Sequence, residues 1–341
     1  MKTATTSERR TARAGDVCRA RAKTFSIKNI LVPIDFSEPS LSAVEFAFPV
    51  AKQFGADLHL AHVFEPDYPI TSMVALPLIV PEVEVGRRVR RHLKDIAKKY
   101  SVELKRGNIH AAKGKAFVEI CRIARERNID LIVIATRGNT GLKHLALGST
   151  AERVVRYSHC PVLVARGLEQ TKTTARNGQR PAEVKFEKIL VPVDFSDCSM
   201  KAVHYAKRLA SQFGSKLVLV HSVAIQYWIT NDEYARYDLP ILTQQSQKIA
   251  REQMRELVQK LKREGLEVTS SIEIGHAGLE ICGQAERERV DAIVTSTHGT
   301  TGLKHILLGS TAEYVVRHAT CPVLVVPSNE RATLPSSAKE K

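Results

Sequence analysis

Residues 140–165, TGLKHLALGSTAERVVRYSHCPVLVA, return as residues 301–326, TGLKHILLGSTAEYVVRHATCPVLVV, at an offset of 161 positions. Two earlier segments repeat in the same order. KNILVPIDFS at 28–37 returns as EKILVPVDFS at 187–196, and QFGADLHLAHV at 53–63 returns as QFGSKLVLVHS at 212–222, both at an offset of 159. Similarity of this kind at a fixed interval indicates a duplicated structural unit. The 341 residues therefore predict two copies of one domain, with a net insertion of two residues in the second copy before Gly275.

Short apolar segments alternate with longer segments of helical periodicity in each copy, which is the pattern of a parallel sheet with crossover helices. In the first copy we expect strands at 30–34, 57–63, 102–110, 130–135 and 161–165, and helices at 39–54, 84–100, 115–127 and 148–157. Strand segments such as ILVPI and LIVIA are almost wholly apolar, as expected where helices cover both faces. The predicted fold class is α/β, with two tandem Rossmann-like domains, each a five-stranded parallel doubly wound sheet with four helices.

The chain divides along the repeat. We expect a disordered basic tail at 1–26, a first domain at 27–167, a polar linker at 168–184, a second domain at 185–327 and a disordered C-terminal tail at 328–341. Residues 64–83 and their counterpart 224–240 lack clear periodicity and predict long irregular connections, which in compact domains are often lids or partner surfaces.

The net charge of +15 raises the question of an anionic partner. Part of this charge lies in the N-terminal tail and part on the helix expected at 84–100, in Arg87, Arg88, Arg90, Arg91, Lys94, Lys98 and Lys99. A solvated helix face is one explanation, and contact with nucleic acid, anionic lipid or an acidic protein is the other. We do not expect nucleic acid to be the main partner.

Several classes of protein are disfavoured by the remaining features. The apolar segments are far shorter than the roughly 20 residues of a membrane span, and the N-terminus has no secretory signal pattern. The six cysteines form no C-x-x-C pair, so neither a zinc site nor a disulfide framework is expected. We expect no metal site, no membrane span and a cytoplasmic location.

An acidic residue follows the first strand of each copy in the pattern V-P-x-D-F-S, with Pro33 and Asp35 in the first copy and Pro192 and Asp194 in the second. In open α/β sheets, ligands bind beyond the carboxyl ends of the strands. A carboxylate there can accept hydrogen bonds from a ribose or hold a metal bound to phosphate. It can equally cap the following helix. The spacing alone leaves both roles open.

Small residues gather after the fourth strand. The first copy reads Ala135-Thr-Arg-Gly138, nine residues, then Gly148-Ser149-Thr150, and the second reads Ser296-Thr-His-Gly299, nine residues, then Gly309-Ser310-Thr311. Glycine lets a backbone approach an anion closely, and a helix beginning at Gly-Ser-Thr presents free N–H groups and the positive end of its dipole. Neither a Walker loop nor a G-x-G-x-x-G motif is present. The pattern predicts a phosphate loop in each copy.

These residues resemble the universal stress protein family in its tandem two-domain form, over residues 28–165 and 187–326. The resemblance implies the adenine nucleotide alpha hydrolase-like fold. The ATP-binding subgroup has the motif G-x-x-G, nine residues, G-[ST], which Gly138, Gly148 and Ser149 match, as do Gly299, Gly309 and Ser310. Ala135 and Ser296 stand where the family has its first glycine. The resemblance assigns the strand-one aspartate to Asp35 and Asp194, and the adenine-contacting backbone to Val63 and Val223.

The resemblance also implies a function. We expect an ATP-binding regulatory protein of the stress response, with or without Mg²⁺, in which the final strands Val162–Ala165 and Val323–Val326 pair the two domains. A homodimer and a regulatory protein partner stay open. No Ser, Cys or Thr shows a recognisable pairing with a base, so dedicated catalysis is not expected and ATP hydrolysis would be slow at most. We expect His62 and His221 to be structural, whereas Arg137 and His298 could contact phosphate.

Overall fold

The computed structural model describes residues 26–65, 81–100, 104–136, 147–166, 184–224, 235–299 and 308–328, with the backbone alone for 235–243. The first repeat contains β1 (Asn29–Pro33), α1 (Glu38–Phe54), β2 (Asp57–Phe64), α2 (Glu82–Lys99), β3 (Ile109–Lys113), α3 (Ala116–Glu126), β4 (Leu131–Ala135), α4 (Ser149–Tyr157) and β5 (Val162–Ala165). The second contains β6 (Lys188–Pro192), α6 (Asp197–Phe213), β7 (Lys216–Val223), α7 (Ala235–Arg263), β8 (Val268–Ile274), α8 (Ala277–Glu288), β9 (Ala292–Ser296), α9 (Ser310–His318) and β10 (Val323–Val326).

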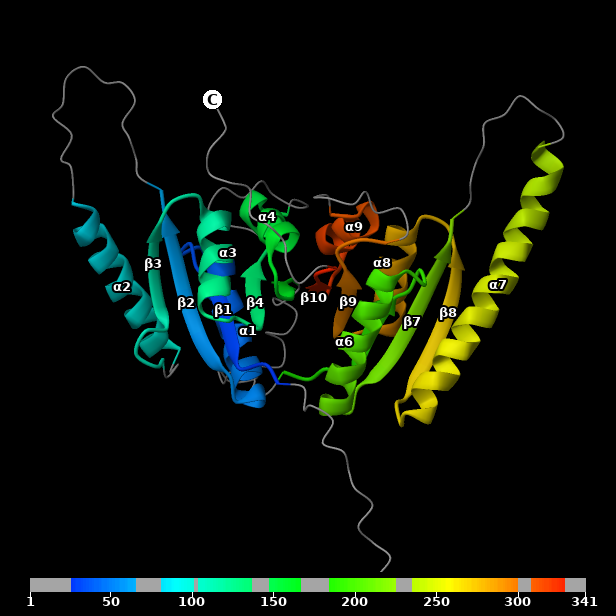
Figure 1. Cartoon of the computed structure of the whole chain (residues 1–341), viewed down its shortest axis with the longest axis horizontal. Helices are drawn as coiled ribbons and strands as arrows, with labels where there is room; N and C mark the ends of the chain where they lie inside the picture. The colour runs from blue at the N-terminus through cyan, green and yellow to red at the C-terminus, as the bar shows by residue number, and fades with distance from the viewer. Residues whose placement is uncertain are drawn as a thin grey trace, which may run out of the picture.

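The strands form one sheet in the order β3-β2-β1-β4-β5-β10-β9-β6-β7-β8. Strands are parallel within each repeat, and the two repeats meet where β5 and β10 pair antiparallel, with Leu163 opposite Leu324. Figure 1 shows the consequence, with α2 and α7 at opposite ends and α4 and α9 near the middle. The predicted fold class is confirmed, and the expected pairing of the final strands joins the two five-stranded sheets into one.

Helices cover both faces of the sheet because strand side chains point alternately to each face. Leu163 packs with the cluster that contains residues of α1, α2, α6 and α7. Its neighbours Val162 and Val164 pack with the cluster that contains residues of α3, α4, α8 and α9. The central strands therefore contribute to two apolar cores, whereas the edge strand β8 contributes to the first one only.

The first helix of each repeat is capped at both ends. Ser37 is the N-cap of α1 and accepts a hydrogen bond from Ser40 N, and Ser196 caps α6 in the same way through Ser199 N. Gly55 ends α1 in the left-handed conformation at φ 63°. Such caps satisfy terminal amides and carbonyls that the helix itself leaves unpaired.

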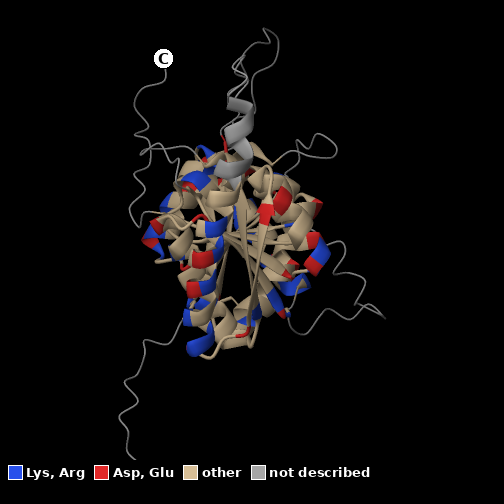
Figure 2. Ribbon diagram, turned by 90° about the vertical axis from the view of Figure 1, so that its right-hand side faces the viewer, with Lys and Arg blue, Asp and Glu red and all other residues tan. Residues whose placement is uncertain are grey.

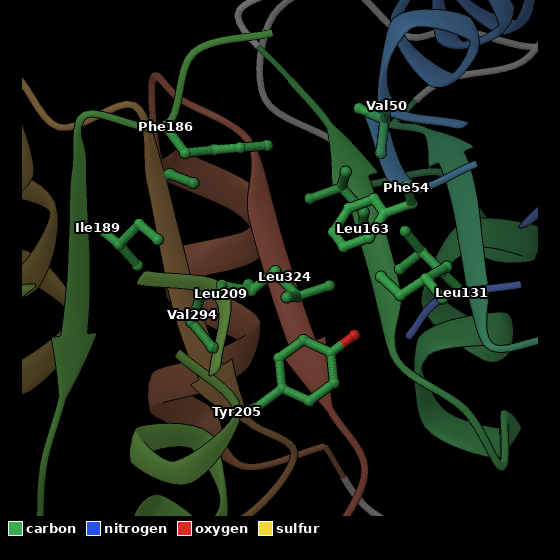
Figure 3. Close-up of a pocket in the computed structure, with 12 residues that line it drawn as sticks. Val50, Phe54, Leu131, Leu163, Phe186, Ile189, Tyr205, Leu209, Val294 and Leu324 are labelled. Carbon is green, nitrogen blue, oxygen red and sulfur yellow. The ribbon is translucent and has the colours of Figure 1, made fainter. Parts of the chain in front are cut away.

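Apolar side chains from both repeats meet at the seam between β5 and β10. They surround a cavity of about 30 Å³, space for roughly one water. Figure 3 shows Phe54 and Leu163 of the first repeat facing Tyr205 and Leu324 of the second across it. Polar contacts also cross the seam, because Arg166 Nη1 donates to Val316 O at 2.7 Å.

Two predicted boundaries were wrong. The third strand was expected at 102–110, but β3 runs from Ile109 to Lys113 because Gly107, at φ 99°, and the 3.1 Å hydrogen bond from Asn108 N to Lys105 O form a turn before it. The irregular stretch expected at 224–240 ends earlier, since α7 begins at Ala235 and continues through Pro240. Residues 66–80 and 167–183, which include most of the first irregular stretch and the expected linker, lie outside the described residues.

Candidate functional site

The strand order reverses between β1 and β4 in the first repeat and between β6 and β9 in the second, which places the two candidate sites. Asp35 and Asp194 follow the last residues of β1 and β6, Pro33 and Pro192. Asp35 Oδ1 accepts hydrogen bonds from Ser37 N at 3.0 Å and Ser37 Oγ at 2.5 Å. Asp194 Oδ1 accepts the equivalent bonds from Ser196 at 3.0 and 2.6 Å. One carboxylate oxygen thus holds the serine that caps the helix.

The phenylalanine after each aspartate has an unusual backbone conformation. Phe36 and Phe195 lie at φ 66° and 61°, in the left-handed region that costs a non-glycine residue about 1 kcal/mol. Their rings pack on His62 and His221, at centroid distances of 4.5 and 5.1 Å. These packing contacts offset the strain.

The two histidines have structural partners, in agreement with expectation. His62 Nδ1 lies 2.7 Å from Ile34 O, and His221 Nδ1 lies 2.7 Å from Val193 O. Both rings therefore hold the chain as it leaves the first strand of each repeat, next to the aspartate.

The second repeat brings the predicted small residues together around Asp194. A Cβ on Gly299 would lie 2.4 Å from Asp194 Oδ2, so only glycine fits there without displacing the carboxylate. A Cβ on Gly309 would lie 3.3 Å from Thr297 O and 3.6 Å from His298 Cα. The loop after β9, the start of α9 and the acid after β6 thus lie together at one rim, where the strands end.

The helices at these rims begin without side-chain caps. Gly148 and Gly309 are the N-cap residues of α4 and α9, and each donates its own amide to the preceding loop, to Thr136 O at 2.7 Å and Thr297 O at 2.8 Å. The next residue, Ser149 or Ser310, is exposed, and Thr150 and Thr311 are half-buried. No side chain therefore caps either helix, and anion binding by the first-turn amides stays a prediction.

The residues at the family's first glycine position have different roles. Ala135 ends β4 and is buried. Ser296 ends β9, and its hydroxyl donates to His298 O at 2.7 Å, so it stabilises the loop internally. Gly138, Arg137, His144 and His305 lie outside the described residues, and the first repeat's rim is described only through Asp35, Ala135 and the start of α4.

The assignment of Val63 and Val223 as equivalent positions was wrong. His62 pairs with Ala111 and His221 with Ile272, so the residue after each histidine is equivalent, namely Val63 and Ser222. Val223 corresponds to Phe64, and the carbonyls of both accept a hydrogen bond at 3.1 Å from a glycine, Gly275 or Gly114. The off-by-one error arose because the two strand ends differ in sequence.

Comparison with known proteins identifies the family of the chain. The profile of the Universal stress protein family matches residues 26–166 and 185–327. The chain belongs to this family.

Some relatives match one repeat of this chain, and others match both repeats. A universal stress protein of Methanocaldococcus jannaschii is 34% identical over 146 residues, which cover 41% of this chain and 82% of the relative. One of Mycolicibacterium smegmatis is 26% identical over 305 residues, which cover 87% of this chain and 96% of the relative. The crystal structure of a universal stress protein from Archaeoglobus fulgidus matches with a TM-score of 0.59 at 22% identity, over 89% of this chain and 97% of that one. The first two are similar in sequence, and the last supports the fold alone.

The described part of this universal stress protein contains no group of three or more His, Cys, Asp and Glu residues that could hold a metal ion, and no helix long and apolar enough to cross a membrane. The five described cysteines are free. Burial raises the pKa of Cys121 and of Cys160 to about 12. These thiols stay protonated at neutral pH, so they are poor nucleophiles.

One constellation was missed by sequence reasoning. Ser328, where we began the C-terminal tail, lies 3.1 Å from both His298 Nδ1 and Thr297 Oγ1. Lys201 Nζ contacts Ser328 O. These partners are 30 or more positions away from Ser328, and no local motif marks them.

Charge differs between the two outer helices. On α2 the positions 87, 91, 94 and 98 are basic and exposed, and they share one helix face. At the matching positions of α7, 161 residues later, stand Lys248, Glu252, Arg255 and Gln259. Figure 2 shows the α7 end of the molecule, where Lys and Arg alternate with Asp and Glu.

Proposed function

We propose that this universal stress protein binds ATP at the carboxyl ends of its strands and acts as a nucleotide-dependent regulatory protein. The observation that carries the proposal is the contact between Gly299 and the Asp194 carboxylate, where a Cβ would lie only 2.4 Å from Oδ2. Glycine at this place keeps a carboxylate, a bare loop backbone and a helix N-terminus around one crevice. These are the groups that a nucleotide with a polyphosphate requires.

Each group has a role in the proposed complex. The amides at the start of α4 and α9 bind phosphate oxygens, helped by the hydroxyls of Ser149 and Ser310. The second carboxylate oxygen of Asp35 and of Asp194 accepts a ribose hydroxyl or holds Mg²⁺ on the phosphates. The cofactor supplies charge and a conformational signal.

The same helices connect the rims to the seam, which suggests how occupancy acts. Glu152 on α4 pairs with Arg156 at 2.8 Å and, across the seam, with Arg317 of α9 at 3.3 Å. Arg317 also pairs with Glu313 at 2.8 Å. A phosphate that binds the first-turn amides of α4 or α9 changes the position of these charged side chains. Nucleotide occupancy thereby favours one arrangement of the two domains over another.

Calorimetric titration with ATP tests the binding. We expect saturable binding that is weakened at one site by Gly148→Val and at the other by Gly309→Val, because a Cβ on Gly309 already meets Thr297 O at 3.3 Å. Gly283→Val on α8, where a Cβ would meet only Arg287 Nη1 at 3.3 Å, is the matched control. No saturable binding to the parent would overturn the proposal. Multiple turnover that depends on Asp35 and Asp194 would instead favour an ATPase.

A second candidate function is contact with a polyanion through α2. Its exposed cations include Arg91, Lys94 and Lys98, whereas α7 interleaves its own with acids and pairs Arg255 with Glu252 at 3.4 Å. Affinity for labelled duplex DNA or anionic vesicles would then fall steeply with salt. It would be lost in Arg91→Gln/Lys94→Gln/Lys98→Gln, but not in the matched α7 variant Arg251→Gln/Arg255→Gln/Lys260→Gln. Equal behaviour of the two variants would contradict this candidate.

A further inference from the structure

Two glutamates from different repeats share one arginine at the seam. Arg317 Nη2 lies 3.3 Å from Glu152 Oε2 of α4 and 2.8 Å from Glu313 Oε1 of α9. The other oxygen of the first glutamate, Glu152 Oε1, lies 2.8 Å from Arg156 Nη2. Four charged side chains therefore form one continuous row of ion pairs between α4 and α9, the two helices near the middle of the molecule (Figure 1).

These four residues are equivalent in pairs, but their contacts are not. At the repeat offset of 161 positions, Glu152 corresponds to Glu313 and Arg156 to Arg317. Among the ion pairs of the described residues, Glu152 contacts both arginines, whereas Glu313 contacts Arg317 alone. The reverse arrangement, with both arginines on Glu313, uses the same side chains and follows from the first by exchange of the two repeats. The row of ion pairs thus has two alternative arrangements.

Both arginines have a donor left for the second arrangement. Nε of Arg156 and Nε of Arg317 are buried and have no hydrogen-bond partner within the described part of the chain. Because an unpaired buried donor is unfavourable, the observed arrangement does not use the full bonding capacity of either guanidinium. The four side chains of the row are between 22 and 35% exposed, so salt screens their interactions less than those of fully exposed pairs.

Each glutamate lies in the helical turn that borders a proposed phosphate site. The amide of Glu152 donates to Gly148 O and that of Glu313 donates to Gly309 O, both at 2.9 Å. The amides that precede these two, at the start of α4 and α9, are the ones that the proposed function assigns to phosphate. One helical turn rises about 5.4 Å, which is less than the screening length of about 8 Å in physiological salt. A phosphate at either site therefore acts on the glutamate of the same helix.

We propose that the two nucleotide sites are negatively coupled through this row of ion pairs, so that ATP at one site weakens binding at the other. The inference rests on the proposed function, since it requires ATP at both rims. Glu152 repels a phosphate at the start of α4, and two arginines on its carboxylate reduce the repulsion. The same arrangement leaves Glu313 with a share of Arg317 only, so a phosphate at the start of α9 meets a more negative turn. Each arrangement therefore favours one site and disfavours the other.

Calorimetric titration with ATP of the parent and of two single-site variants measures the coupling. Gly309→Val reports the affinity of the first site alone, and Gly148→Val reports that of the second. We expect the second ATP to bind the parent about 5–150-fold more weakly than it binds the matching single-site variant, which is the usual range for coupled sites. Because coupling is reciprocal, the factor is the same whichever site is filled first.

Removal of either partner in the pair across the seam should abolish the coupling without abolishing ATP binding. In Arg317→Gln, and independently in Glu152→Gln, the coupling factor should fall to about 1 when it is measured with the same two valine substitutions. Arg122→Gln is the matched control, because the ion pairs of Arg122 with Glu119 and Glu126 lie within α3. It should keep the coupling factor of the parent. Urea unfolding of each variant verifies that it is folded.

The outcomes separate this inference from the proposed function. A parent that binds no ATP overturns the proposed function. Three results overturn the coupling alone: two sites that bind independently or strengthen each other, a coupling factor that survives both Arg317→Gln and Glu152→Gln, or a folded single-site variant that binds no ATP while the other one does.

Discussion

Gly299 and Asp194 touch so closely that the contact excludes every side chain but hydrogen at position 299. A Cβ there would lie 2.4 Å from Asp194 Oδ2, while the other carboxylate oxygen is held by Ser196 N at 3.0 Å. The carboxylate is therefore positioned from two sides, by the helix that follows it and by the loop after β9. The need for glycine at this position comes from lack of space.

Gly299→Ala should weaken nucleotide binding at the second site. The added methyl group displaces either the carboxylate or the loop, and overpacking of this kind costs about 1–3 kcal/mol. ATP affinity at that site should fall about tenfold or more in a calorimetric titration. Gly283→Ala, where a Cβ would meet only Arg287 Nη1 at 3.3 Å, should bind as the parent does. Unchanged affinity in Gly299→Ala would place the nucleotide away from this contact.

A buried histidine pair should make the first repeat sensitive to acid. His59 Nδ1 lies 3.1 Å from His110 Nε2, between β2 and its edge neighbour β3. Burial is the main cause that lowers the pKa of His110 from 6.5 to about 4, with smaller effects of His59, Arg127 and Arg122 opposed by Glu126. Burial also lowers the pKa of His59, against the opposing charge of Asp57.

The sign of this effect follows from linkage. The unfolded chain binds protons to these histidines as the pH falls below about 6.5, whereas folded His110 binds one only near 4. Urea unfolding should therefore show a loss of stability as the pH falls between these values. The second repeat has Val218 and Ser271 at the matching positions, so His59→Val/His110→Ser should remove that part of the pH dependence. An unchanged pH profile in this variant would contradict the prediction.

The sequence predicts those parts of the fold that depend on local patterns. The apolar segments of β1, β4 and β5, the N-caps Ser37 and Ser196 and the C-cap Gly55 can all be recognised within a few residues. The start of β3 could not be recognised in this way, because the turn at Gly107 interrupts a segment whose composition resembles that of a strand. The antiparallel pairing of β5 with β10 has no local signal and was expected only from family resemblance.

For the candidate site, the sequence predicts which residues share the rim but not the contacts between them. Asp194, Gly299 and Gly309 could be named as members of one rim because parallel strands end at the same edge of the sheet. The distance of 2.4 Å between a Cβ on Gly299 and Asp194 Oδ2, which makes glycine obligatory, could not be predicted, because it depends on a packing contact between residues far apart in the chain. The approach of Ser328 to His298 depends on how the chain leaves β10, which no motif records.

At one packed position the two repeats carry different pairs of side chains. This difference predicts that a second substitution should restore the stability that a first one removes. Phe117 of α3 has Arg153 over its ring at 5.0 Å, whereas the second repeat has Gly278 and Tyr314 at these places. A Cβ on Gly278 would lie 2.5 Å from Tyr314 Cδ1, so Gly278→Phe should destabilise the protein by about 1–3 kcal/mol. Adding Tyr314→Arg should recover most of this in urea unfolding. If the two substitutions instead lower the free energy of unfolding additively in the double variant, the prediction is contradicted.

The cavity at the seam should be fillable from the second repeat. Ala292 lines it, and the repeat counterpart Leu131, 161 positions earlier, lines the opposite side with a larger side chain. Ala292→Val adds apolar atoms to a space of about 30 Å³, which at about 24 cal/mol per Å³ is worth up to about 0.7 kcal/mol. Urea unfolding should show a higher midpoint, whereas Leu131→Ala should cost about 2–5 kcal/mol because it enlarges the same space. A lower midpoint for Ala292→Val would mean that the seam already closes around Ala292, so that the two halves of the sheet are packed more tightly than the cavity implies.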